Sequence, residues 1–164
     1  MKKYLQNKEE SMRFILACVI LGLEHLHNKN IVYSDLKPSN ILIFEDGYAK
    51  LADFGVSKQL KEGAPCTFQI GTQRYFAPEM VVGAECKRFV DLWAIGVLAY
   101  HLSNYDFPFT TEQIREASTF ERVVRKAEKD RFWKNKFVSE DLKDFINGCL
   151  KLKAKERLGA RNWE

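Results

Sequence analysis

The 164-residue sequence lacks closely spaced cysteines, and this absence argues against two common classes of small domain. Only four cysteines occur, and they lie far apart in the chain: Cys18, Cys66, Cys86 and Cys149. A disulfide-rich secreted domain or a structural zinc site usually shows Cys-x-x-Cys pairs or a dense cysteine framework. We therefore expect free thiols in a reducing compartment, which favours a cytoplasmic protein.

The chain also lacks a hydrophobic run long enough to cross a membrane. The segment Phe14–Leu23 is apolar, but a transmembrane helix needs about 20 such residues, and Glu24 follows the segment directly. The N-terminal residues Met1–Tyr4 do not lead into the apolar core of a signal peptide. The sequence therefore predicts a soluble protein with no membrane partner.

The chain also has no large excess of charge of one sign. It contains 26 basic and 22 acidic residues, so the formal net charge is only +4. Basic residues gather between positions 122 and 136, but Glu121, Glu128 and Asp130 are interspersed among them. This mixture is typical of a solvated helix face, so we expect no nucleic-acid partner. The 46% of hydrophobic residues is enough for one domain with a buried core.

Three segments have the pattern of helices. Ser11–His27 and Phe89–Leu102 are apolar around most of a helical circumference, which predicts helices buried inside the domain. Pro108 should prevent a continuation of the second one. Ser139 is a good N-cap for a third helix, because apolar residues follow it at helical spacing: Leu142, Phe145, Ile146, Cys149 and Leu150.

Short strands are expected at Ile41–Ile43 and Tyr48–Leu51, because Asp46-Gly47 between them is a strong hairpin signal. The stretch Gln59–Gly71 contains two glycines and Pro65 and has no sustained periodicity, which predicts a mobile loop. The fold expected from these patterns is mainly α, with one small β-hairpin.

Four short motifs occur in a fixed order along the chain. They are Asp35-Leu36-Lys37-Pro38-Ser39-Asn40, Asp53-Phe54-Gly55, Ala77-Pro78-Glu79 and Asp91-Leu92-Trp93-Ala94-Ile95-Gly96. Any one of them could arise by chance, and the first alone would pass for an ordinary polar loop. The four together, in this order, indicate a site for phosphoryl transfer.

The polar residues of the first two motifs suit that chemistry. Asp35 can orient and deprotonate an acceptor hydroxyl, and Lys37 on the same loop can offer a compact positive charge to the transferring group. Asn40 and Asp53 supply the hard oxygen ligands that Mg²⁺ prefers. The hairpin should hold these two residues on adjacent strand ends, and Gly55 should allow a sharp turn after Asp53.

This set of motifs resembles that of the eukaryotic protein kinases over essentially the whole chain. The resemblance implies ATP as phosphoryl donor with Mg²⁺, and Lys37 beside Asp35 implies serine or threonine acceptors in protein substrates. It also implies that Thr72 bonds the catalytic acid and lysine, and that Leu42 forms the floor beneath the adenine ring. Asn40 and Asp53 would be the metal ligands.

The same resemblance assigns structural roles. Glu79 would pair with a buried arginine, here Arg157, and Asp91 would hold the backbone of the catalytic loop. The Val32-Tyr33 lead-in and the ending Arg157-Leu158-Gly159 look most like the AGC group of these kinases.

In that family the nucleotide is covered by an N-terminal lobe, for which no counterpart precedes Tyr4. The resemblance therefore implies a partial kinase domain over residues 1–164, consisting of the C-terminal lobe with the N-terminal lobe absent. Its parts would be a catalytic loop at 33–40, a metal-binding turn at 53–55, an activation segment at 53–79 and a helical subdomain at 89–164. The uncovered nucleotide face could then require a regulatory protein partner.

Some positions depart from the family pattern. Ser34 stands where many members carry an arginine that receives an activation-loop phosphate, so phosphorylation at Thr67, the nearest candidate, should couple less strongly to Asp35. Ser39, Arg74 and His101 stand where arginine-directed AGC kinases carry acids, which predicts no strong preference for arginine-rich substrates.

Two function classes remain open at this point. The first is a serine/threonine kinase fragment whose isolated chain turns over little, because donor positioning is most of the catalysis. The alternative is a non-catalytic, pseudokinase-like binding or regulatory module. A third interpretation, that upstream exons are missing from the sequence, would reconcile the two.

Overall fold

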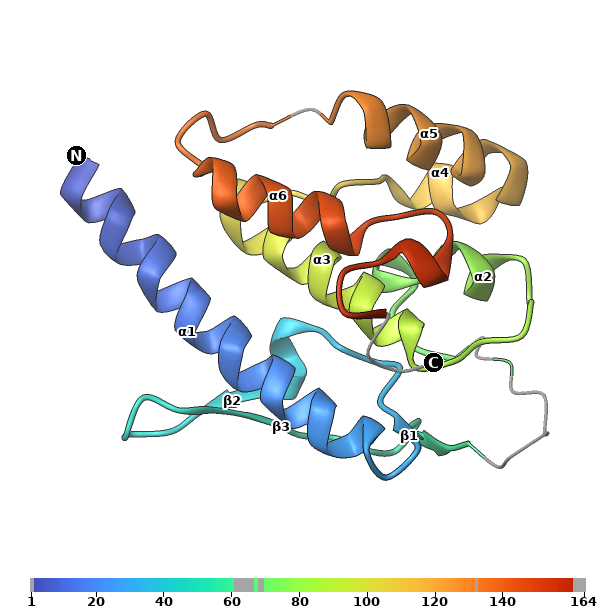
Figure 1. Cartoon of the computed structure of the whole chain (residues 1–164), viewed down its shortest axis with the longest axis horizontal. Helices are drawn as coiled ribbons and strands as arrows, with labels where there is room; N and C mark the ends of the chain where they lie inside the picture. Colours follow the sequence, from blue (N-terminus) through green and yellow to red (C-terminus); the bar gives the residue numbers. More distant parts are fainter. Residues whose placement is uncertain (1, 61–66, 68–69, 132, 161–164) are drawn as a thin grey trace.

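The helix α3 (Phe89–Asn104) forms the centre of the molecule, with α6 (Glu140–Cys149) packed beside it (Figure 1). The computed structural model describes residues 2–60, 67, 70–131 and 133–160. A β-hairpin lies at one end of the molecule and two further helices lie at the opposite end (Figure 1). This arrangement confirms a mainly helical fold with small antiparallel sheets.

Helix α3 confirms the prediction of a central buried helix, since thirteen of its 16 residues are buried. The helix approaches α6 closely at Gly96, where an added Cβ would lie only 2.7 Å from the Cβ of Cys149. It ends where Tyr105 adopts a left-handed conformation (φ 54°) and donates its backbone N–H to the carbonyl of His101. Pro108 therefore lies beyond the helix end.

Helix α1 (Lys2–His27) begins nine residues earlier than the sequence pattern predicted. The prediction that it is buried inside the domain was wrong. Leu16, Val19 and Leu23 pack into the core, but Phe14 and Leu21 on its other side are 46% and 64% exposed. The physical reason is that α1 lies across one face of the molecule, so only one side of the helix meets α3 and the hairpin (Figure 1).

The predicted hairpin is present. Strand β2 (Ile41–Ile43) pairs antiparallel with β3 (Ala49–Leu51), with Ile41 opposite Leu51. Gly47 supports the turn with φ 84°, a conformation that favours glycine. The strand ends of this hairpin nearest the body of the molecule carry residues of the candidate site.

A second, unpredicted sheet joins β1 (Ile31–Val32) to β4 (Lys58–Gln59), also antiparallel. Two-residue strands are too short to show periodicity in the sequence, so they could not be predicted. Gln59, expected to begin a mobile loop, therefore belongs to a strand. Most of that expected loop (61–66 and 68–69) lies outside the described residues.

The remaining elements are the short 3-10 helices η1 (Pro38–Asn40), η2 (Gln73–Tyr75) and η3 (Ala154–Glu156) and the helices α2 (Pro78–Val81), α4 (Thr111–Arg115) and α5 (Ala117–Lys129). Ser139 is confirmed as the N-cap of α6, because its side-chain oxygen accepts from the backbone N–H of Leu142. Glu9 of α1 accepts hydrogen bonds from the backbone and hydroxyl of the same Ser139, which ties the two helices together.

A buried ion pair joins the middle of the chain to its C-terminal part. Both outer nitrogens of Arg157 donate to the carboxylate of Glu79, at 2.6 and 2.7 Å. The same guanidinium donates to the carbonyls of Phe89 and Lys151, so it is well satisfied although almost completely buried. The expected pairing of Glu79 with Arg157 is confirmed.

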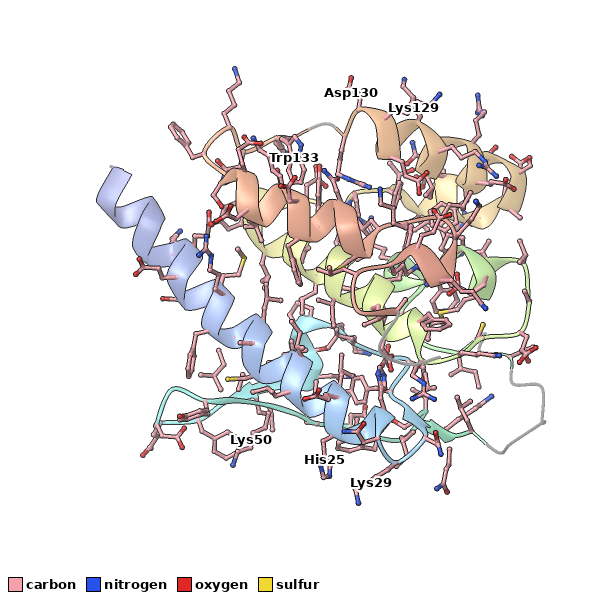
Figure 2. All side chains as sticks on the ribbon, viewed as in Figure 1. His25, Lys29, Lys50, Lys129, Asp130 and Trp133 are labelled. Atoms are coloured by element: carbon pink, nitrogen blue, oxygen red, sulfur yellow. The ribbon has the colours of Figure 1, made fainter. Side chains whose placement is uncertain are left out.

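Side chains at the edges of the molecule match the solvated surface that the charge pattern predicts. Lys129 and Asp130 project from the end of α5, and His25 projects from the end of α1 (Figure 2). Cys18, Cys86 and Cys149 are free thiols, whereas Cys66 lies outside the described residues. Within the described part of the chain, no helix is both long enough and apolar enough to span a membrane.

Candidate active site

The loop between β1 and η1 is held by a single buried carboxylate, that of Asp91 at the start of α3. Its two oxygens accept the backbone N–H groups of Tyr33 and Ser34, at 2.9 and 2.8 Å. The ring nitrogen Nε2 of His27 lies 2.8 Å from the same carboxylate. These bonds support Ser34 in a left-handed conformation (φ 65°), which a residue with a Cβ adopts only at a cost. Asp91 thus positions the residue that follows, Asp35.

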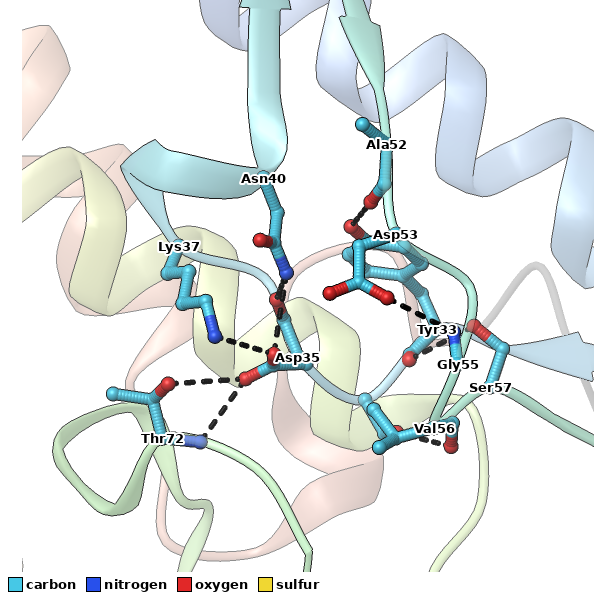
Figure 3. Close-up of polar contacts among 11 residues, drawn as sticks. Tyr33, Asp35, Lys37, Asn40, Ala52, Asp53, Gly55, Val56, Ser57 and Thr72 are labelled. Carbon is cyan, nitrogen blue, oxygen red and sulfur yellow. Dashed lines mark hydrogen bonds and ion pairs between the residues drawn. The ribbon is translucent and has the colours of Figure 1, made fainter.

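The carboxylate of Asp35 is the centre of a hydrogen-bonded cluster (Figure 3). Lys37 Nζ donates to Asp35 Oδ2 at 2.6 Å, and Asn40 Nδ2 donates to the same oxygen at 3.2 Å. The other oxygen, Oδ1, accepts the backbone N–H and the hydroxyl of Thr72, at 3.0 and 3.1 Å. Four residues predicted for the site therefore meet at one carboxylate.

The protonation state of Asp35 follows from these contacts. Burial by itself would raise the pKa of the carboxyl group, but the hydrogen bonds from Lys37 and Thr72 and the charge of Lys37 outweigh it. The pKa of Asp35 consequently lies below its ordinary value. The group is ionised at neutral pH and can accept a proton.

Asn40 and Asp53 come from the two strand ends of the hairpin, next to Asp35 (Figure 3). The backbone N–H of Ala52 donates to the carbonyl of Asn40 at 2.9 Å, which fixes the spacing of the two strands there. The amide of Asn40 turns its nitrogen toward Asp35. Among the described residues, nothing donates a hydrogen bond to its Oδ1, nor to Oδ2 of Asp53.

The turn after Asp53 differs from its prediction. Asp53 itself takes the left-handed conformation (φ 56°), whereas Gly55 has no positive φ. The backbone N–H of Gly55 donates to Asp53 Oδ1 at 3.1 Å, and an added Cβ at Gly55 would lie 3.1 Å from the same oxygen. Gly55 lies in the predicted turn, in which the backbone N–H of Ser57 donates to the carbonyl of Phe54 at 3.1 Å, and it allows a close approach of its backbone to the Asp53 carboxylate.

The donor set at this place fits a magnesium ion that is shared with phosphate groups. An amide oxygen and a carboxylate oxygen are hard ligands, and Mg²⁺ is usually held by one or two protein groups together with phosphates and waters. No group of three or more histidines, cysteines and acids that could hold a metal occurs among the described residues. Asn40 and Asp53 would thus bind the ion together with a nucleotide and not alone.

Leu42 lies on β2, one residue beyond Ile41, with half of its surface exposed. Its neighbours Ile43 and Phe44 are exposed as well, at 62% and 45%. The expected position of Leu42 beneath an adenine ring is compatible with this exposure. The hairpin therefore presents an apolar surface beside the polar cluster.

Three residues that sequence reasoning did not assign to the site also build it. Gly71 (φ 131°) lets Thr72 approach, because an added Cβ would lie 3.2 Å from Ser34 O and 3.3 Å from Asp35 Oδ1. The hydroxyl of Tyr33 donates to the carbonyl of Ala52 and so joins the loop to β3, and burial raises the pKa of this hydroxyl to about 12. His27 supports Asp91.

The signal for these residues was weak. Gly71 ends the predicted loop Gln59–Gly71, Tyr33 only precedes the first motif, and His27 ends the first predicted helix. Its ring is only 2% exposed, and it contacts Asp91, which lies 64 positions further along the chain. Such a long-range contact has no local pattern.

Comparison with known proteins identifies the family of the chain. The model of the protein kinase domain matches residues 1–163. The chain belongs to the protein kinase domain family.

Curated relatives support the same family. The chain is 42% identical over 153 residues to a probable serine/threonine-protein kinase of Dictyostelium discoideum, covering 93% of this chain and 32% of the relative. It is 34% identical to G protein-coupled receptor kinase 1 of Caenorhabditis elegans, covering 93% and 24% of the two chains. It is also 34% identical to ribosomal protein S6 kinase 2 beta of Xenopus laevis, covering 98% and 25%.

These relatives confirm the likeness to AGC kinases that the sequence motifs indicated. The chain spans about a third or less of the length of these relatives. The matched part of this kinase domain contains Asp35, Lys37, Asn40, Asp53 and Thr72.

Proposed function

We propose that this kinase domain contributes to the transfer of the γ-phosphoryl group of ATP to serine or threonine hydroxyls of protein substrates. The observation that carries the proposal is the meeting of Lys37, Asn40 and Thr72 at the carboxylate of Asp35, with Asp53 on the neighbouring strand end. In an ordinary polar loop we would not expect these groups to come together from three separate segments: the loop 35–40, the turn at Asp53 and the segment at Thr72.

The roles follow from the positions. The acceptor oxygen attacks the γ-phosphorus, the bond from that phosphorus to the β–γ bridging oxygen breaks, and the hydroxyl proton passes to Asp35. Lys37, which already lies against Asp35, offers positive charge to the transferring group, and Thr72 keeps the carboxylate oriented. Asn40 and Asp53 would hold Mg²⁺, which neutralises phosphate charge when it is bound.

We further propose that the isolated 164 residues bind nucleotide weakly and turn over little. Leu42 of the hairpin is 50% exposed, so this apolar side chain gives an adenine ring contact on one side only. Donor positioning supplies most of the rate in phosphoryl transfer. A protein surface that covers this hairpin, a regulatory partner or a further part of a longer chain, would provide the rest.

The alternative is a binding or regulatory module that does not turn over. The same exposed hairpin favours it, because an uncovered apolar surface next to a satisfied polar cluster is suited to a partner. For either function we propose a cytoplasmic location, which the free thiols of Cys18, Cys86 and Cys149 support.

The test is a titration of the ¹⁵N-labelled chain with ATP in the presence and absence of Mg²⁺, followed by NMR. We expect Mg²⁺-dependent shifts of the amides around Asn40 and Asp53, and their loss in Asp53→Ala. Asp130→Ala, which removes an exposed carboxylate at the end of α5, is the matched control.

Two outcomes would count against these proposals. Shifts that are scattered over the surface, or that persist in Asp53→Ala, would contradict a phosphoryl-transfer site. Robust autophosphorylation by the isolated chain, abolished by Asp53→Ala, would support the kinase function but refute the proposed low turnover.

A further inference from the structure

The segment that clamps Asp35 continues directly into an exposed arginine. Thr72 donates twice to Asp35, and the short helix η2 (Gln73–Tyr75) follows it. Tyr75 is buried and anchors η2 to the core, whereas Arg74 in the same turn is exposed. A 3-10 helix advances about 2 Å per residue, so the backbone of Arg74 is roughly 4 Å along the helix axis from Thr72. The backbone of Arg74 therefore lies within two residues of Thr72, the residue that contacts Asp35.

The guanidinium of Arg74 is held in place by an aromatic ring. Its Cζ lies 4.6 Å from the centroid of Phe107. Phe107 is itself fixed, since the ring of His101 stacks on it at 4.2 Å and Tyr75 meets it edge to face at 5.6 Å. A cation–π contact orients a guanidinium without neutralising its charge. The positive charge of Arg74 is thus positioned but not cancelled.

The carboxylates nearby do not cancel it either. Among the described residues, none places a carboxylate oxygen within 4.0 Å of the Arg74 side chain. Asp106 and Glu112 interact electrostatically with the Arg74 guanidinium. Asp106, however, pairs with Lys134 at 3.3 Å, and Glu112 forms a hydrogen bond with Thr110.

The other cation of the site, Lys37, has a carboxylate partner. Lys37 donates to Asp35 at 2.6 Å, so its charge is balanced by the acid that receives the acceptor proton. Arg74, two residues after Thr72, is a cation with no carboxylate partner within 4.0 Å in the described structure.

We propose that Arg74 selects acceptor segments that carry an anionic side chain, either a carboxylate or a phosphorylated residue, close to the serine or threonine. This inference rests on the proposed kinase function and adds a substrate class to it. An extended peptide advances about 3.3 Å per residue, which places the anionic residue within about four positions of the acceptor.

The expected size of the preference follows from the exposure of the pair. An ion pair at a solvated surface changes an affinity by about two- to fivefold, and the planar guanidinium can reach the upper part of that range by binding a carboxylate through two nitrogens. The preference should shrink at high salt, since a surface pair is screened over about 10 Å at 0.1 M ionic strength.

The experiment measures peptide binding by the purified chain directly, so it needs no turnover. Fluorescent serine peptides carry aspartate, phosphoserine or arginine at each position from −4 to +4, and anisotropy and ¹⁵N shifts of the Arg74 region report binding. We expect the aspartate and phosphoserine peptides to bind about two- to fivefold more tightly than neutral ones at low salt. The two anionic series also distinguish a carboxylate from a phosphate ligand.

Arg74→Gln should abolish this preference and Arg74→Glu should reverse it toward arginine peptides. Arg122→Glu, which makes the same charge change at an exposed position of α5, is the matched control and should keep the preference. An unchanged preference in Arg74→Glu, equal binding of all peptides, or no binding at millimolar peptide would overturn the inference. The nucleotide titration with Asp53→Ala is independent of this result, so a failure here is distinguishable from a failure of the proposed function.

Discussion

Replacing Asp91 by asparagine tests whether this buried carboxylate positions the catalytic loop. In the structure its two oxygens receive three contacts, from the backbone N–H groups of Tyr33 and Ser34 and from the ring of His27. Asparagine keeps one acceptor oxygen and replaces the other by an NH₂ group, which would face a buried donor. The size and the volume of the side chain hardly change, so packing in the core should be preserved.

The magnitude can be worked out from these bonds. A hydrogen bond to a charged group contributes about 1.5–3 kcal/mol, and an orphaned buried donor adds a desolvation cost, so Asp91→Asn should lose roughly 2–4 kcal/mol. That is a large share of the ~5–15 kcal/mol that stabilises a typical domain. The backbone at Ser34, held at φ 65°, should relax first because it has no other support of this strength.

Urea unfolding and amide hydrogen exchange measure the two parts of this effect. We expect a lower free energy of unfolding and faster exchange of the Tyr33 and Ser34 amides. The α3 amides should exchange faster only by the amount that the loss of global stability accounts for. Asp144→Asn, an exposed aspartate of α6, should stay within about 0.5 kcal/mol of the unmodified chain, as surface substitutions usually do. Equal stability of the two variants, with unchanged amides at Tyr33 and Ser34, would refute the reasoning.

Three further predictions concern other parts of the fold. Gly96→Ala should lower the free energy of unfolding by about 1–3 kcal/mol in a urea titration, because its Cβ would lie 2.7 Å from a side-chain carbon of α6. Glu79→Ala should cost about 3–5 kcal/mol in the same assay, since it leaves the buried guanidinium of Arg157 without its carboxylate; a cost below 1 kcal/mol would contradict this. The pKa of Asp35 lies below 3.8 in the folded chain, so its contribution to stability is present above that pH and is lost as the pH falls through the folded pKa. Lys37→Met should move this pKa upward in a ¹³C NMR titration of the carboxyl group, and an unchanged pKa would show that the ion pair has no influence.

Sequence patterns predicted the elements whose cause is local. Ser139 caps α6 because its hydroxyl reaches the N–H of a residue three positions later, and Asp46-Gly47 forms a turn because glycine accepts a positive φ. Helix α3 was predictable because its residues are apolar around almost the whole circumference, a pattern that is typical of a buried helix.

Patterns failed where the cause is a neighbour distant in sequence. Leu21 and Phe14 of α1 have the same character as buried residues, and only the absence of a covering element among the described residues leaves them exposed. The bounds of helix α5 were not predicted, although the charge pattern of residues 122–136 is typical of a solvated helix face, because only Phe120 and Val124 are buried among its many charged residues.

The candidate site shows the same division. Phosphoryl transfer was indicated by the types and the order of four residues: Asp35, Lys37, Asn40 and Asp53. The resemblance to protein kinases came from the four motifs. The backbone details that let them meet, such as the left-handed φ of Asp53, depend on the folded loop and have no sequence signature.

The hairpin of β2 and β3 has a mechanical consequence for the metal ligands. Asn40 and Asp53 stand at the feet of two strands that are bonded to each other, and the N–H of Ala52 ties the strands together at that point. We therefore expect a displacement of the exposed hairpin tip to move both side chains together. Such a movement would change their position relative to Asp35 more than their distance from each other.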